Sequence, residues 1–240
     1  MRSYNGSFDL VETLDQNSLS AQVQMNYSLL MIREVAKDPE FGPQTRVYTP
    51  ARTVAFSKRE ALMPGFDRAW EIAQDMGYQP VLRTTGGRTV VYNENSLVFD
   101  LVVPEPLLRY QSSFIFREFG MALVGTLRSI AVDARLGPVP GEFCPGAFSV
   151  NARNKTKLIG TAQRASRGAR LISGVLQLSE ADEVREVLTE VNQALNFEWD
   201  PATVGALDQE IGSFDPQLVR TFLNDQVRAF GNQLFRQDYS

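Results

Sequence analysis

The residues of this chain best suited to covalent chemistry are one cysteine and a lysine that follows it closely. Cys144 is the only cysteine, and it lies in a segment rich in glycine and proline, GEFCPG at 141–146. Functional side chains favour such loops, although a lone cysteine is more often an inert small residue of the core. Lys157 begins the apolar segment KLIGTAQ at 157–163. It could either point to water from an edge strand or face a pocket.

The chain contains no histidine, which removes the most common general base at neutral pH. A Ser-His-Asp triad, a Cys-His pair and a histidine-ligated metal site are therefore excluded. A single cysteine cannot form a thiolate cluster either, so we expect no metal site. Any nucleophilic chemistry must use lysine or a carboxylate as its base.

A further segment that could carry chemistry is RTTGGR at 83–88, between two predicted strands. The adjacent glycines Gly86 and Gly87 let a main chain approach a ligand closely. Their N–H groups, with Arg83 and Arg88 nearby, could hold a carbonyl, a phosphate or a pantetheine group. A simple turn with two surface arginines explains the same residues, so this segment alone does not decide the function.

The composition is typical of a soluble globular protein and argues against several partners. The 240-residue chain has a formal net charge of -4, which does not favour nucleic acid as the main partner. The sequence shows no secretory signal and no apolar segment long enough to cross a membrane, so we expect no membrane partner. One cysteine cannot form an internal disulfide, and we therefore expect a reducing, cytoplasmic location.

Hydrophobic periodicity predicts five helices. They are expected at 19–35, 66–76, 106–130, 181–195 and 218–235. Ser18 or Ser20 is expected to cap the first helix, and Ser179 the fourth. The apolar face of the first helix is expected to comprise Val23, Tyr27, Leu29, Leu30 and Ile32.

Between these helices, short runs of β-branched and aromatic residues predict strands. They are expected at 45–50, 52–57, 80–83, 88–92, 96–103, 146–151, 156–163 and 170–178. Tight turns at Asn154 and Gly168 join the last three strands as antiparallel hairpins. The predicted fold class is α+β, with a mostly antiparallel mixed sheet flanked by helices. No linker divides residues 1–240, so we expect a single domain.

Taken together, the three segments resemble the biotin/lipoate A/B protein ligase family. RTTGGR is similar to the Arg-x-x-Gly-Gly turn that walls the family's acyl pocket. KLIGTAQ is similar to the strand whose lysine contacts the acyl carbonyl, and the order of the segments also matches. The resemblance covers residues 27–195 and implies a catalytic domain like those of class II synthetases and biotin ligases.

The cysteine loop favours one of two chemistries found in this family. Ligases that activate a free acid as its adenylate tend to carry Gly-Arg-Asn-Asp before the lysine strand. Many also have a C-terminal accessory domain, for which we expect no room here. GEFCPG instead looks like the loop of cysteine-dependent octanoyltransferases. The resemblance therefore implies transfer to a lysine of a lipoyl-domain protein, such as the E2 component of a 2-oxoacid dehydrogenase or the glycine cleavage H protein.

In this scheme Cys144 would be the nucleophile, and Lys157 would promote its thiolate form and hold the donor carbonyl. N–H groups near Gly146 or in the lysine strand would stabilise the oxyanion. The donor would be an octanoyl or lipoyl thioester, for example on acyl carrier protein, or an octanoyl-lysine, with no cofactor required. The other residues implied to bind the substrate are Arg83, Thr85, Gly86, Gly87, Arg88, Gly160, Thr161 and Ala162.

Two alternatives stay open. In an ATP-dependent lipoate ligase, with ATP and Mg²⁺, Cys144 would be incidental. A non-catalytic binder of lipoylated partners is kept open by a departure from the family pattern, since Tyr92-Asn93 stands where a His-Asp or similar pair is common. Leu82 likewise replaces a second arginine before Arg83. A simple binder would need neither Cys144 nor Lys157.

Overall fold

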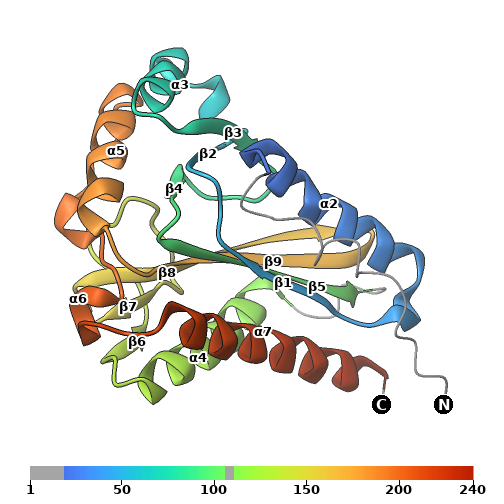
Figure 1. Ribbon diagram of the computed structural model, residues 1–240. Helices are drawn as coiled ribbons and strands as arrows, with labels where there is room; N and C mark the ends of the chain where they lie inside the picture. Colours follow the sequence, from blue (N-terminus) through green and yellow to red (C-terminus); the bar gives the residue numbers. More distant parts are fainter. Residues whose placement is uncertain (1–18, 106–110, 240) are drawn as a thin grey trace.

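The largest element of the protein is a six-stranded sheet (Figure 1). The computed structural model describes residues 19–105 and 111–239. The strand order is β1-β5-β9-β8-β7-β6, and every neighbouring pair is antiparallel. The strands are β1 (Gln44–Tyr48), β5 (Ser96–Glu105), β6 (Ala134–Leu136), β7 (Val150–Ala152), β8 (Thr156–Ser166) and β9 (Gly168–Gln177).

The predicted hairpins at the end of this sheet are confirmed. Arg153 and Asn154, with φ of 55° and 58°, form the turn between β7 and β8. Gly168, with φ of 87°, turns the chain from β8 into β9. Backbone in this left-handed region matches the twist of two paired strands, which makes such tight connections possible.

A second, three-stranded sheet has the order β3-β2-β4, formed by β2 (Thr53–Ser57), β3 (Gln79–Arg83) and β4 (Val90–Tyr92). β2 and β4 are antiparallel, whereas β2 and β3 are parallel. The parallel pair is possible because the chain crosses over through η3 (Glu60–Leu62) and α3 (Phe66–Asp75). The two sheets together give the mostly antiparallel, mixed arrangement that the sequence predicts.

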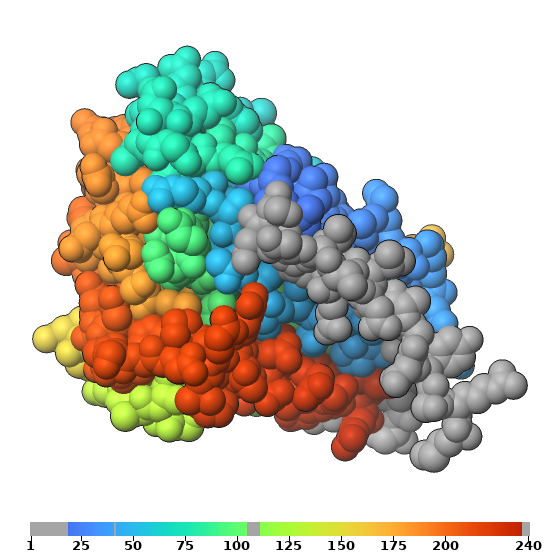
Figure 2. Space-filling model, viewed as in Figure 1, coloured from blue at the N-terminus to red at the C-terminus, as the bar shows by residue number. Residues whose placement is uncertain are grey.

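Helices cover both faces of the large sheet (Figure 1). On one face, α4 (Ser112–Ser129) and α7 (Pro216–Tyr239) enclose the main hydrophobic core. There the rings of Phe119 and Phe230 stack, with their centroids 4.7 Å apart. On the other face, α2 (Ala21–Lys37) packs on β5 and β9 and also on the small sheet. α5 (Ala181–Ala194) joins α3 against the small sheet. In the view of Figure 2, α7 runs across the lower part of the molecule, with α5 at the left and α3 at the top. Shorter elements are η2 (Pro39–Phe41), η4 (Pro201–Thr203) and α6 (Asp208–Ile211).

The buried face of α2 differs from the predicted one. Val23 and Leu30 are about half exposed, at 48% and 50%, while Gln24 and Ser28 are buried. The buried polar groups find partners there: the Gln24 side chain accepts from the N–H of Ala51 at 2.9 Å, and the Ser28 hydroxyl donates to the carbonyl of Met25 at 2.8 Å. The main-chain carbonyl of Gln24 accepts from the buried Arg46. A polar side chain can be buried when it has such partners, and apolar periodicity cannot reveal them.

Other predicted boundaries need correction. Of the predicted strand 146–151, only the end belongs to β7, because residues 146–149 are held in a loop by a side chain described below. The predicted long helix begins at Ser112, and its expected start at 106–110 lies outside the described residues. Ser20 does cap α2, but the N-cap of α5 is Glu180 instead of Ser179, and it makes no side-chain cap bond.

Candidate active site

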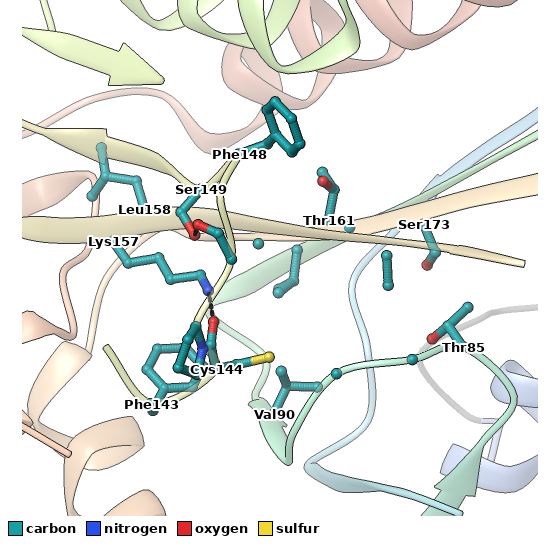
Figure 3. A pocket seen from close by; sticks show the side chains of 18 of the residues that line it. Thr85, Val90, Phe143, Cys144, Phe148, Ser149, Lys157, Leu158, Thr161 and Ser173 are labelled. Carbon is teal, nitrogen blue, oxygen red and sulfur yellow. Dashed lines mark hydrogen bonds between the residues drawn. The ribbon is translucent and has the colours of Figure 1, made fainter. Parts of the chain in front are cut away.

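A cavity of about 440 Å³ opens between the two sheets, and it brings together almost all of the predicted site residues. Its walls come from β4, β8 and β9, from the start of α4, and from the loops at 83–87 and 143–149 (Figure 3). Ten of the eleven predicted residues line it: Arg83, Thr85, Gly86, Gly87, Cys144, Gly146, Lys157, Gly160, Thr161 and Ala162.

The thiol of Cys144 points into this cavity (Figure 3). Its Sγ accepts a hydrogen bond from the main-chain N–H of Arg88 at 3.2 Å. That N–H is presented by Gly87, whose φ of 102° is in the region that favours glycine. The loop at 83–88 therefore contacts the thiol through its main chain.

Lys157 is buried beside the cysteine loop and is only 7% exposed. Its Nζ donates to the main-chain carbonyl of Cys144 at 2.6 Å (Figure 3) and forms an ion pair with Glu142 at 3.0 Å. β8 lies between β9 and β7, so the alternative of a water-facing lysine on an edge strand is wrong. The sequence led us to expect that the ammonium acts on the thiol of Cys144. In the structure it contacts the main-chain carbonyl of the same residue instead.

A β-bulge aims Lys157 at the loop. Lys157 pairs with Asn151 and Ile159 with Val150, which leaves Leu158 as an extra residue. The extra residue changes the alternation of side chains, so that Lys157 lies on the same side as Gly160. A Cβ on Gly160 would lie 3.1 Å from Cε of Lys157. Gly160 therefore makes room for the lysine side chain, and it also lines the cavity.

Glu142 is the site residue that sequence reasoning missed. It is 2% exposed, and its carboxylate accepts hydrogen bonds from the Gly146 N–H at 2.9 Å and the Ser149 hydroxyl at 2.8 Å. With Lys157, these contacts hold the loop around Cys144 and keep residues 146–149 out of strand β7. The Gly146 N–H is thus already bonded and is not free here to stabilise an oxyanion. The only signal in the sequence was an acidic residue inside a glycine- and proline-rich loop.

Arg88 lies outside the cavity lining. Its guanidinium lies over the ring of Phe197, 4.3 Å from the centroid. The side chain therefore packs against the protein, and the prediction that it binds the substrate is not supported by its position. Only its main chain, through the N–H to Cys144 and the carbonyl to Arg83, belongs to the site.

Comparison with known proteins identifies the family. The protein-family model for the lipoyl protein ligase A/B catalytic domain matches residues 46–229 of this chain. The chain belongs to this family. Two curated relatives are octanoyl-GcvH:protein N-octanoyltransferases of Exiguobacterium sp. and Exiguobacterium sibiricum, which are 25% and 32% identical over 173 and 129 residues. The matches cover 72% and 53% of this chain but only 61% and 46% of the relatives, so the chain spans about half of their length.

Solved structures of lipoyl ligases share the fold. A lipoate-protein ligase A bound with ATP superimposes with a TM-score of 0.62 and 19% identity, covering 88% of this chain and 90% of the other. A bi-partite lipoate protein ligase from Thermoplasma acidophilum gives a TM-score of 0.57 at 18% identity, with 88% of each chain covered. These likenesses establish the fold alone.

The departure from the lipoyl ligase family pattern at Tyr92-Asn93 has a structural explanation. Asn93 is fully buried, and it donates to Glu183 at 2.8 Å and accepts from Gln177 at 2.9 Å. It therefore holds the turn after β4 in place. Tyr92 lines the cavity, and burial raises the pKa of its phenol to about 12, with nearby Arg83 offsetting part of the rise. Tyr92 is therefore neutral at physiological pH and can donate a hydrogen bond.

Metal ligands and membrane spans can be assessed for the part of the chain at 19–105 and 111–239. Within it, no group of three or more cysteine, aspartate and glutamate side chains is placed to hold a metal ion. Among the same residues, no helix is long and apolar enough to cross a membrane.

Proposed function

We propose that this chain is an acyltransferase that moves an octanoyl or lipoyl group through a thioester on Cys144 to a lysine of a lipoyl-domain protein. The observation that carries the proposal is the thiol itself, which points into a large cavity beside a buried lysine. The names of the curated relatives describe octanoyl transfer from GcvH to protein. Their names and the cysteine loop favour the transferase over the ATP-dependent ligase.

The first half of the reaction loads the enzyme. The Cys144 thiolate attacks the carbonyl carbon of the donor thioester, the bond from that carbon to the donor sulfur breaks, and the departing thiolate takes up a proton. The Lys157 ammonium, which also lies 5.0 Å from the centre of the Phe143 ring, uses two of its three N–H donors on Cys144 and Glu142. We propose that the third donates to the developing oxyanion. With an octanoyl-lysine donor, the bond from the carbonyl carbon to the lysine nitrogen breaks instead. That nitrogen takes up a proton as it leaves as an amine.

The second half releases the product. The neutral amine of the acceptor lysine attacks the same carbon, the bond to the Cys144 sulfur breaks, and the nitrogen loses a proton as the amide forms. The acyl tail would lie along the apolar wall formed by Phe116, Val90 and Val175. Each buried methylene contributes about 0.8 kcal/mol, so an eight-carbon chain binds well without charge pairing.

The proposed partners follow from this chemistry. The donor would be an octanoylated GcvH or acyl carrier protein, and the acceptor a lipoyl domain of a 2-oxoacid dehydrogenase E2 component. In this reaction the acyl group arrives already linked to the donor. The chain itself then supplies the nucleophile and the contacts that hold its loop, and no ATP is used.

The proposal predicts a covalent intermediate that forms without ATP. Purified protein incubated with octanoyl-acyl carrier protein is expected to gain the mass of one octanoyl group, because exchange between two thioesters is close to equilibrium. Neutral hydroxylamine should remove the group, and Cys144→Ser should not acquire it. Intact mass spectrometry measures both results. With octanoyl-GcvH as donor, little intermediate should accumulate, since a thioester is less stable than an amide, and transfer to the acceptor is measured instead.

Other results would favour the alternatives. If Cys144→Ser modifies a lipoyl domain as fast as the wild type, or if both proteins need ATP and free octanoate, the chain is a ligase. If neither donor nor free acid is used while a lipoylated domain binds tightly, the chain is a binder.

A further inference from the structure

Arg83 is a buried cation, and no carboxylate among residues 19–105 and 111–239 forms an ion pair with it. It is 5% exposed and lines the cavity at the end of β3. Its Nη2 donates to the main-chain carbonyl of Arg88, while Nε has no hydrogen-bond partner among the residues that the structure describes. A buried charge is strongly unfavourable unless an opposite charge compensates it. An anion within the same site would therefore stabilise this arginine.

The side chain that lies against Arg83 and can become an anion is Cys144. A Cβ placed on Gly87 would lie 2.6 Å from Nη2 of Arg83 and 3.0 Å from Sγ of Cys144. The guanidinium and the thiol therefore flank the same open side of Gly87, close enough for a charge on one to act on the other. The N–H of Arg88 completes the surroundings of the sulfur, since it also donates to Sγ.

The other ionisable groups near Arg83 already have partners or are neutral. Glu60 is 2% exposed, and its carboxylate accepts hydrogen bonds from the N–H of Ser57 and from the N–H and hydroxyl of Thr89. Among the described residues it forms no ion pair with Arg83. The Tyr92 phenol is neutral, because burial raises its pKa to about 12. The carboxylate of Asp100 is already bonded to Arg46 at 2.5 Å. Glu142 is paired with Lys157 on the other side of the cysteine loop, where the lysine contacts the carbonyl of Cys144.

We propose that Arg83 is the counter-ion of the Cys144 thiolate, and that Lys157 and Glu142 position the loop that carries the thiol. The sequence suggested a different assignment, with Lys157 as the cation for the thiol and Arg83 as a substrate contact. The inference deepens the proposed function, because a thiolate is the reactive form of the nucleophile. It can be tested without any acyl group.

The first test is the alkylation of Cys144 by iodoacetamide at neutral pH, followed by intact mass. Arg83→Gln is expected to slow alkylation about tenfold or more, because the thiolate loses its counter-ion. Arg83→Lys should recover most of the rate. Arg68→Gln removes the same charge from an exposed site on α3, where the side chain is 62% exposed, and should react like the wild type. Thermal unfolding confirms that each variant is folded.

A second readout separates a charge effect from a distorted loop. Arg83→Gln should slow the anionic reagent iodoacetate more than neutral iodoacetamide, because the cation also attracts the reagent. A distorted loop would slow both reagents equally, and that result would overturn the proposal. Alkylation of folded Arg83→Gln at the wild-type rate would also overturn it.

The wild-type protein offers a test that needs no Arg83 variant. The ultraviolet difference between the wild type and Cys144→Ser at neutral pH should contain the absorbance of a thiolate. If the thiol is fully protonated there, the proposal is wrong. An Arg83-dependent thiolate together with no acylation by any donor would refute the proposed function alone, so the two failures can be distinguished.

Discussion

Replacing Gly87 by alanine is expected to lower the rate of octanoyl transfer about 100-fold, since a misplacement of about 1 Å at a reacting group has an effect of this size. A Cβ at this position would collide with Nη2 of Arg83 and crowd the sulfur of Cys144. The backbone φ of 102° adds strain of about 1–3 kcal/mol for any residue with a side chain. The Arg88 N–H would then no longer reach the thiol. The measurement is the transfer rate to a lipoyl domain, together with the thermal unfolding midpoint.

Gly77→Ala is the matched control. Gly77 has a similar φ of 82°, but nothing lies within 4 Å of the added methyl group, and the residue is far from the cavity in the loop before β3. It should lose a comparable amount of stability and keep its transfer rate. Equal activity of folded Gly87→Ala and wild type would show that the close approach of this loop to Cys144 is not needed for transfer.

Lys157→Met is expected to remove most of the activity and also to destabilise the protein. On an exposed edge strand, one of the two positions that the sequence allowed, this lysine would contribute little to stability. The structure instead buries both partners of the Lys157–Glu142 pair, whose side chains are 6% and 1% exposed. Removing one partner leaves an unpaired buried carboxylate, which costs about 3–5 kcal/mol. Chemical denaturation of the variant measures this loss.

The double variant Glu142→Gln with Lys157→Met separates stability from activity. It removes both charges, and glutamine keeps an oxygen that can accept from Gly146 or Ser149. We expect it to recover most of the free energy of unfolding while transfer remains about 100-fold or more below wild type, because a donor to the oxyanion is missing. A single Lys157→Met variant as stable as the wild type would contradict the buried ion pair. Recovered activity in the double variant would show that the ammonium is not required.

The sequence by itself determined the elements whose signals are local. α3 and α5 were predicted to within one residue at each end, because their apolar periodicity and flanking residues lie within the helix or next to it. The hairpins of β7, β8 and β9 follow from turn residues between the strands. The missing histidine and the single cysteine restricted the chemistry, since composition does not depend on the fold. The order and residue types of three short segments were sufficient to indicate the family.

Only the tertiary structure decided which atoms meet at the site. Glu142 became visible as the residue that holds the cysteine loop because its partners Gly146, Ser149 and Lys157 surround it in space. The bulge at Leu158 turned Lys157 inward, although alternation alone leaves its direction open. Arg83 and Cys144, from two different loops, both lie against Gly87. Arg83 and Cys144 come from segments distant in the sequence, and the nearer partners of Glu142 meet it only because the loop folds back on itself. A buried charge needs a partner that no local pattern specifies.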